Sequence, residues 1–311
     1  MSKTALLFAG QGAQVVGMGR DWVEQFPTAR AWFERADAAL GYPLSEVCFH
    51  GPEAELTKTE HAQPGIYLVS WVALELLREA VPGLRFAATA GLSLGEFTAL
   101  AAAGVLSFED GLKVVRQRGR FMQEACEATE GGMAAIIGLD EAATREVCAE
   151  AGVELANLNC PGQLVISGAT AGIARAVELA RARGARRAIP LPVAGAYHSR
   201  LMASAQPKLE AALAAVPLNH PAVPVIANVT AQPHGAPSDI HRRLVEQVTS
   251  PVRWEDSIRH LLSEGFTRFI ELGPGTALSG FLRRIDRSAT ALNVADTASL
   301  EKTVRALKEN P

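Results

Sequence analysis

The chain has 311 residues, of which 48% are hydrophobic and 6% aromatic, and its 30 Lys and Arg nearly balance its 33 Asp and Glu. This length allows one large domain, or a large domain with a smaller one inserted, and the scarcity of aromatic residues favours packed helices over a β-sandwich. The formal net charge of −3 argues against general nucleic-acid binding.

The four cysteines lie far apart and form no C-x-x-C pair. They predict neither a zinc site nor a disulfide framework, and they fit a reducing compartment. The N-terminal apolar run is too short for a signal peptide, and no apolar stretch approaches the roughly 18 residues of a membrane span. We therefore expect a cytoplasmic protein that binds neither membrane nor metal, and we take a monomer as the expected oligomeric state.

Apolar runs of strand length alternate with helical patterns in the first and last parts of the chain. In the first part, strands are predicted over 5–9 and 86–90, and helices over 21–40, 66–79 and 108–127. In the last part, strands are predicted over 223–228 and 267–272, and helices over 254–264, 278–285 and 299–308. This order predicts an α/β fold whose core has a mostly parallel sheet.

The pattern changes between residues 131 and 192. Here strands are predicted over 133–138, 153–159, 163–168 and 185–191, and helices over 141–152 and 171–184. The order βαββαβ is that of a ferredoxin-like fold. We therefore predict a hydrolase-like large subdomain (residues 1–130 and 193–311) with an inserted ferredoxin-like small subdomain (residues 131–192).

A nucleophile elbow is predicted at residues 91–95, Gly-Leu-Ser-Leu-Gly. The segment follows a predicted strand and precedes a helical run, which is the context that the G-x-S-x-G pattern needs. The glycines allow a sharp turn, and backbone N–H groups at a helix N-terminus can stabilise an oxyanion beside Ser93. The alternative is that Ser93 only caps the following helix.

His198 is the candidate general base, because a serine hydroxyl is a poor nucleophile without one. It lies where the chain returns from the small subdomain to the large one, and clefts form at such hinges. The other six histidines lie in polar stretches, loops or charged helices, where solvated side chains are expected.

Taken together, these features resemble the malonyl-CoA:acyl carrier protein transacylase family. Nine segments match the family in order and spacing: residues 10–14 (GQGAQ), 63–64 (QP), 91–96 (GLSLGE), 118–123 (RGRFMQ), 159–168 (NCPGQLVISG), 197–199 (YHS), 228–230 (NVT), 250–254 (SPVRW) and 271–275 (ELGPG). Each is weak alone, but together they cover residues 5–285 and make the match specific.

The resemblance implies that Ser93 accepts the acyl group and that His198 is its general base. In this family backbone carbonyls orient the imidazole in place of a triad acid, and the matching carbonyl here would belong to Ser250. Arg118 is implied to bind the substrate carboxylate, because a guanidinium can make two charge-assisted hydrogen bonds to it. The alternative for Arg118 is a solvated side chain on a basic helix face.

The resemblance also implies an oxyanion hole formed by Gln11 and the backbone N–H of Leu94. The alternative for Gln11 is a plain turn residue. Gln63 matches a pocket residue, and Asn228 is expected to help hold the site.

The sequence departs from the family pattern at two positions. Leu92 stands where most members have His, which changes the hydrogen bonding beside the nucleophile without removing the base. Ser250 stands where Asn is more usual, and only its carbonyl is needed. Tyr197 resembles the bulky residue of malonyl-specific members, since bulk there occupies the space that an α-methyl group needs.

The implied reaction is a ping-pong transfer of malonyl from malonyl-CoA to the phosphopantetheine thiol of acyl carrier protein, through malonyl-Ser93 and without a metal or redox cofactor. Such carrier proteins are small and acidic, and a basic patch of Arg283, Arg284 and Arg287 could steer one; a solvated helix face is the alternative. Other functions stay open: a discrete polyketide synthase acyltransferase, a serine thioesterase or hydrolase, or a non-catalytic docking module.

Overall fold

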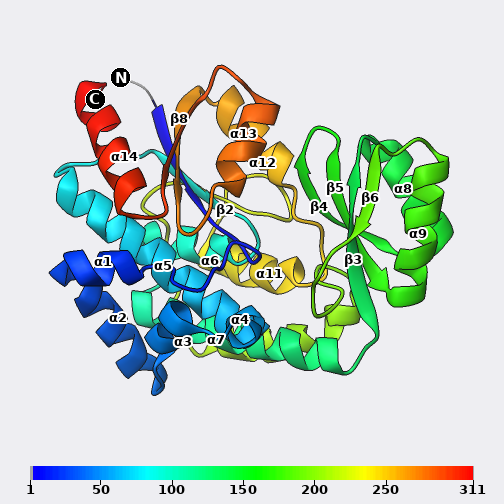
Figure 1. Cartoon of the computed structure of the whole chain (residues 1–311), viewed down its shortest axis with the longest axis horizontal. Coiled ribbons are helices and arrows are strands. Elements are labelled where there is room, and N and C mark those ends of the chain that lie inside the picture. Colours follow the sequence, from blue (N-terminus) through cyan, green and yellow to red (C-terminus); the bar gives the residue numbers. More distant parts are fainter. Residues whose placement is uncertain (1–2, 311) are drawn as a thin grey trace. The chain divides into compact units, whose positions relative to one another are not determined.

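The computed structural model describes residues 3–310. Contacts divide the chain into two compact units, which are described separately. The first unit consists of the chain up to Gly119, Val216–Ile226 and the chain from Leu261 onward, and the second consists of Arg120–Ala215 and Ala227–His260. Figure 1 shows the elements in chain order. Within residues 3–310, no helix combines the length and apolar character needed to cross a membrane.

The first unit contains a sheet of five parallel strands in the order β7-β2-β1-β8-β9. The strands are β1 (Lys3–Phe8), β2 (Ala88–Gly91), β7 (Val225–Ile226), β8 (Phe266–Leu272) and β9 (Thr290–Val294). Phe8 at the end of β1 pairs with Gly91 on one side and Leu272 on the other. The loops that follow these three strands therefore meet at one edge of the sheet, where α/β proteins bind ligands.

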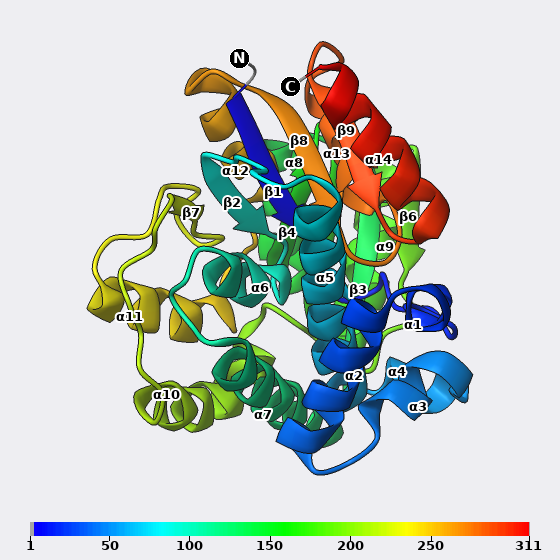
Figure 2. The ribbon, with the colours of Figure 1, turned by 90° about the vertical axis from the view of Figure 1, so that its left-hand side faces the viewer.

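Helices cover both faces of this parallel sheet, whose central strand is buried. In Figures 1 and 2, α5 and α14 lie on one face and α13 on the other. The helices of this unit are α1 (Arg20–Gln25), α2 (Pro27–Leu40), α3 (Leu44–His50), α4 (Glu53–Thr57), α5 (Thr59–Ala80), α6 (Gly95–Ala102), α13 (Ala277–Ile285) and α14 (Thr297–Glu309). Helix α7 (Phe108–Glu127) begins in this unit and ends in the second.

The second unit contains an antiparallel sheet in the order β4-β5-β3-β6. Its strands are β3 (Gly131–Ile137), β4 (Glu154–Cys160), β5 (Gln163–Ala169) and β6 (Arg187–Pro190). Helices α8 (Glu141–Ala151) and α9 (Thr170–Ala182) pack on it around a core that includes the fully buried Ile136 and Ile166. This is the βαββαβ arrangement that the sequence predicted, so the predicted fold class is confirmed.

The remaining elements of the second unit are helical. They are a 3₁₀ helix η1 (Arg200–Ala205), α10 (Gln206–Ala214), α11 (Pro237–Gln247) and the start of α12 (Trp254–Ser263). The predicted small subdomain of residues 131–192 contains the whole antiparallel sheet, whereas the contact-based unit is larger. Its boundaries as a separate domain stay a prediction.

Three predicted elements differ from the structure. The helix predicted over 21–40 is broken at Phe26 (φ −119°, ψ 118°), because the residue before a proline avoids helical angles and Pro27 then starts α2. The helix predicted over 66–79 begins at Thr59 and contains Pro64. The strand predicted over 223–228 shrinks to Val225–Ile226. No predicted range covers α3, α4, η1, α10, α11 or β9.

Candidate active site

Ser93 lies on a tight strand-to-helix turn between β2 and α6. Its backbone is left-handed (φ 51°), which is uncommon for a residue other than glycine. A Cβ added at Gly91 would collide with the backbone of Gly95, and one added at Gly95 would collide with the carbonyl of Phe8. The two glycines of the elbow are therefore required by close backbone approach. They bring Ser93, 9% exposed, to the carboxyl edge of the parallel sheet.

Arg118 on α7 reaches this serine. The side chain is 1% exposed, and its Nη2 donates a hydrogen bond to Ser93 Oγ at 3.2 Å. Its Nη1 donates to Gln63 Oε1 at 2.7 Å, and the guanidinium lies 5.4 Å from the centre of the Phe97 ring. A buried cation beside a candidate nucleophile provides a site for an anionic substrate group.

Leu94 directly follows Ser93, and Gln11 lies in the loop after β1. Leu92 donates its N–H to Phe8 O, and Gly10 packs against Leu92 so closely that a Cβ there would lie 2.9 Å from Leu92 Cδ2. Within residues 3–310, neither Gln11 nor Leu94 uses its backbone N–H in a hydrogen bond. Two such N–H groups at the sheet edge are available to an oxyanion.

His198 lies in the second unit and also has left-handed backbone (φ 59°). Its side chain is buried, and its Nδ1 lies 2.9 Å from the carbonyl oxygen of Gln247. The expectation that Ser250 would supply this carbonyl was therefore wrong. Gln247 ends α11, where the last carbonyls of a helix lack the usual intrahelical partner. Its carbonyl oxygen accepts a hydrogen bond from Ser250 N at 3.4 Å and also faces the imidazole.

The surroundings of His198 are polar and buried. Gln247 Nε2 donates to Asn228 Oδ1 at 3.4 Å, and both residues are at most 1% exposed. Ser199 starts η1 by accepting a hydrogen bond from Leu201 N, which fixes the chain directly after His198. A carbonyl oxygen only accepts, so Nδ1 is the donor in this contact, and in a neutral ring Nε2 is then the acceptor.

Tyr197 is buried next to Cys126. Burial raises the pKa of the Cys126 thiol to about 11, although a hydrogen bond from Tyr197 opposes this shift. Burial likewise raises the pKa of Cys148 to about 11. Both groups are therefore protonated near neutral pH, and neither rivals Ser93 as a nucleophile.

The sequence-predicted residues thus form two groups. In the first unit, Arg118 contacts both Ser93 and Gln63, and Gln63 contacts Gln11. In the second unit, His198 contacts Gln247, which contacts Asn228. The contacts of Ser250 do not include the imidazole. Sequence reasoning missed Gln247, whose contribution is a backbone carbonyl, and Thr59, whose hydroxyl accepts a hydrogen bond from Gln11 Nε2 at 3.4 Å.

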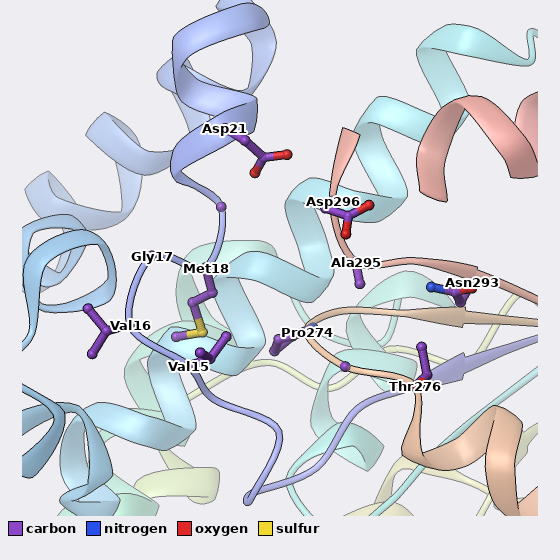
Figure 3. Close-up of a pocket in the computed structure, with 12 residues that line it drawn as sticks. Val15, Val16, Gly17, Met18, Asp21, Pro274, Thr276, Asn293, Ala295 and Asp296 are labelled. Carbon is purple, nitrogen blue, oxygen red and sulfur yellow. The ribbon is translucent and has the colours of Figure 1, made fainter. Parts of the chain in front are cut away.

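Each unit contains a cavity. One of about 400 Å³ is formed in the first unit by the segments 15–21, 274–276 and 293–296 (Figure 3), and no predicted site residue lines it. The other, of about 320 Å³ in the second unit, is lined by His198 together with Thr249 and Pro251. Among residues 3–310, no cluster of His, Cys, Asp and Glu is arranged to hold a metal ion.

Comparison with known proteins identifies the family. The acyl transferase domain family matches residues 5–310. The malonyl CoA-acyl carrier protein transacylase of Bacillus subtilis is 48% identical over 99% of this chain and 98% of that protein. The polyketide biosynthesis protein ThaF of Burkholderia thailandensis is 44% identical over 92% of this chain, which spans 24% of that longer protein.

A similar structure is that of a malonyl-transacylase solved in complex with a type II polyketide synthase acyl-carrier protein. It matches with a TM-score of 0.95 and 36% identity, over 98% of this chain and all (100%) of the other. Sequence and structure thus agree over nearly the full length. The chain belongs to the malonyl-CoA:acyl carrier protein transacylase family of acyl transferases.

Proposed function

We propose that this protein transfers the malonyl group of malonyl-CoA to the phosphopantetheine thiol of acyl carrier protein, with malonyl-Ser93 as the intermediate. The observation that carries the proposal is the buried guanidinium of Arg118, hydrogen-bonded to Ser93 Oγ. A malonyl thioester has a free carboxylate close to its reactive carbonyl, so one substrate can engage both residues. Relatives of nearly full-length similarity that bear this name support the same reaction.

In the first half-reaction, the malonyl carboxylate replaces Ser93 Oγ as the acceptor of the hydrogen bond from Arg118 Nη2. His198 Nε2 takes the Ser93 proton while the serine oxygen attacks the thioester carbonyl. The new C–O bond gives a tetrahedral oxyanion, which the N–H groups of Gln11 and Leu94 stabilise. When the C–S bond breaks, the imidazolium returns its proton to the sulfur of CoA.

The second half-reaction reverses these steps with a different thiol. The phosphopantetheine thiol of acyl carrier protein gives its proton to His198 and attacks the malonyl ester. The C–O bond then breaks, and Ser93 regains the proton. In this scheme the Gln247 carbonyl holds His198 in the tautomer whose Nε2 accepts, and it stabilises the imidazolium formed transiently.

Selectivity for malonyl follows from Arg118. An acetyl group would leave the guanidinium without its anionic partner, and an uncompensated buried charge costs several kcal/mol. Tyr197 is buried at the position expected to limit an α-methyl group, so methylmalonyl transfer is expected to be slower than malonyl transfer.

A second candidate is a discrete acyltransferase that loads polyketide synthase carrier proteins, which the similarity to ThaF favours. It uses the same chemistry and differs only in the acceptor. Transfer to fatty-acid and polyketide carrier proteins, compared at equal concentration, distinguishes the two. A serine hydrolase would instead release free malonate when no carrier protein is present. That the protein acts as a cytoplasmic monomer stays a prediction from the sequence.

The test is intact-protein mass spectrometry after mixing with malonyl-, methylmalonyl- and acetyl-CoA. We expect a malonyl adduct that disappears on addition of phosphopantetheinylated carrier protein and is absent in Ser93→Ala. The control is Ser70→Ala, which removes a fully buried hydroxyl that has no hydrogen-bond partner within residues 3–310. An adduct that persists in Ser93→Ala would assign the nucleophile to another residue.

A further inference from the structure

Helix α5 presents two hydrogen-bonding side chains to Gln11. Thr59 and Gln63 are one helical turn apart, so they lie on the same face of the helix, and both are 0% exposed. Gln11 Nε2 donates to Thr59 Oγ1 at 3.4 Å, and Gln11 Oε1 accepts from Gln63 Nε2 at 3.3 Å. Both ends of the Gln11 amide are therefore held by α5.

Arg118 fixes which atom donates and which accepts in each of these side-chain hydrogen bonds. A guanidinium has only donors, so the Gln63 atom that it contacts at 2.7 Å must be the amide oxygen. Gln63 then has only its NH₂ to offer Gln11, which must accept with its own oxygen. The Gln11 NH₂ is left as a donor, and Thr59 is the acceptor that receives it.

Holding the side chain of Gln11 also holds its backbone. The preceding residue, Gly10, is pressed against Leu92, one residue before Ser93. On the other side, Gly12 has φ 99° and donates its N–H to Gln14 Oε1 at 2.8 Å. The backbone is thus held on both sides of Gln11, and the side-chain bonds of Gln11 hold the residue between them, so the direction of its N–H depends on these bonds.

We propose that Thr59 is a positioning residue for acyl transfer: its hydroxyl fixes the Gln11 amide and thereby aims the oxyanion-stabilising N–H of Gln11 at the carbonyl beside Ser93. The proposal rests on the function proposed above. The hydrogen bond from Gln11 to Thr59 is long at 3.4 Å, and hydrogen bonds among catalytic groups often tighten when substrate binds.

A purely structural role for Thr59 makes a different prediction. Thr59 is the first residue of α5, and its carbonyl lies 2.5 Å from where a Cβ on Gly119 would be, so α5 and α7 are packed tightly here. If Thr59 served only this packing, its replacement would lower stability and would leave the acylation rate of the folded protein unchanged. The acylation rate of the folded protein, compared with its stability, therefore distinguishes a positioning role from a purely structural one.

The experiment measures single-turnover acylation of Ser93 in Thr59→Val, which keeps the size and branching of threonine but removes the acceptor. Acylation by saturating malonyl-CoA should slow about tenfold, with little change in the apparent affinity for malonyl-CoA. The rate of acylation by acetyl-CoA should fall by the same factor, because an oxyanion donor acts on every acyl group. Thr59→Ser keeps the hydroxyl and should stay within about twofold of the unsubstituted protein.

Thr98→Val is the matched control. It makes the same chemical change at a fully buried threonine of α6 whose hydroxyl has no hydrogen-bond partner within residues 3–310. Ser93 of the Thr98→Val variant should be acylated at the same rate as in the unsubstituted protein. Thermal unfolding of all three variants reports stability, and Thr59→Ala replaces Thr59→Val if the latter does not fold.

Three outcomes would contradict the proposal for Thr59 or the function on which it rests. Equal rates for Thr59→Val and the unsubstituted protein overturn the proposal while leaving the acyl transfer itself intact. A loss confined to malonyl-CoA also overturns it, because that result assigns Thr59 to carboxylate binding through Arg118. If the unsubstituted protein forms no acyl-Ser93 at all, the proposed function fails, and the failure is seen before any Thr59 variant is compared.

Discussion

Nη2 of Arg118 donates a hydrogen bond to Oγ of Ser93 across 3.2 Å, although the two residues come from different elements, α7 and the β2–α6 turn. The same guanidinium is buried and stacked near Phe97. In the proposed reaction, the guanidinium must exchange its contact with Ser93 for a group of the substrate. The acyl chain most able to compete carries its own anion.

Replacing Arg118 tests this exchange. Arg118→Ala should slow malonyl transfer by about a hundredfold or more, because the substrate carboxylate would be buried without its partner. Acetyl transfer should fall much less, so the ratio of malonyl to acetyl transfer in a competition assay should drop. Arg120→Ala, an exposed neighbour on α7, is the control and should keep the ratio. An unchanged ratio in Arg118→Ala would remove Arg118 from carboxylate binding.

Replacing His198 tests the general base. His198→Ala should slow acylation of Ser93 by about 10²–10⁴-fold, the usual contribution of a positioned base. Burst kinetics with malonyl-CoA measure this step directly. His241→Ala removes a half-buried imidazole of α11 that faces the carbonyl of Glu210, and it serves as the control. Acylation at the control rate in His198→Ala would mean that another group takes the serine proton.

Glu271 should make stability depend on pH. Burial raises the pKa of this carboxyl, and hydrogen bonds from Leu278 N and Ser279 N at the start of α13 only partly oppose the shift. The unfolded chain therefore loses this proton at lower pH than the folded one, starting near the ordinary value of 4.5. The contribution of Glu271 to stability is fully present below that value and declines as pH rises through the folded-state pKa.

Glu271→Gln removes this titration. The free energy of unfolding of the unsubstituted protein minus that of the variant should be largest near pH 4.5 and should shrink as pH rises. Urea unfolding at a series of pH values above 4.5 measures the difference. A difference that grows with pH would show that the hydrogen bonds from α13 outweigh the cost of burying the charge.

Ala231, three residues after Asn228, should limit the stability of the protein. It is buried and has left-handed backbone (φ 54°), which costs an L-residue with a Cβ about 1–2 kcal/mol. Ala231→Gly should therefore raise the free energy of unfolding by about 1 kcal/mol, since part of the gain is offset by the greater freedom of glycine in the unfolded chain. Chemical denaturation checks this, and acylation rates should not change.

Local sequence was enough to predict the elbow at Ser93. Gly91 and Gly95 are needed because their neighbours approach within backbone contact, and a strand, two glycines and a helix are visible in the sequence. The break between α1 and α2 is also local, because it follows from Pro27, and the sequence interpretation gave too little weight to that proline.

The partner of His198 could not be found in this way. Gln247 contributes a carbonyl that every residue has, and only the end of α11 decides which carbonyl is available. The edge strand β9 was missed for a related reason, since it is mostly half-buried and lacks the apolar run of β1 and β8. Tertiary placement, and not residue type, determines both the carbonyl that faces His198 and the strand β9.

Ser93 and His198 share a backbone property with Ala231: they are the three non-glycine residues between 3 and 310 with positive φ. At the first two positions glycine would relax the main chain but would also delete the side chain that is proposed to react. A substitution to glycine at either position would therefore exchange relief of backbone strain for loss of the proposed acyl transfer. Laboratory evolution of more durable variants should be screened for turnover in every round, because stability and chemistry make opposite demands on the backbone at positions 93 and 198.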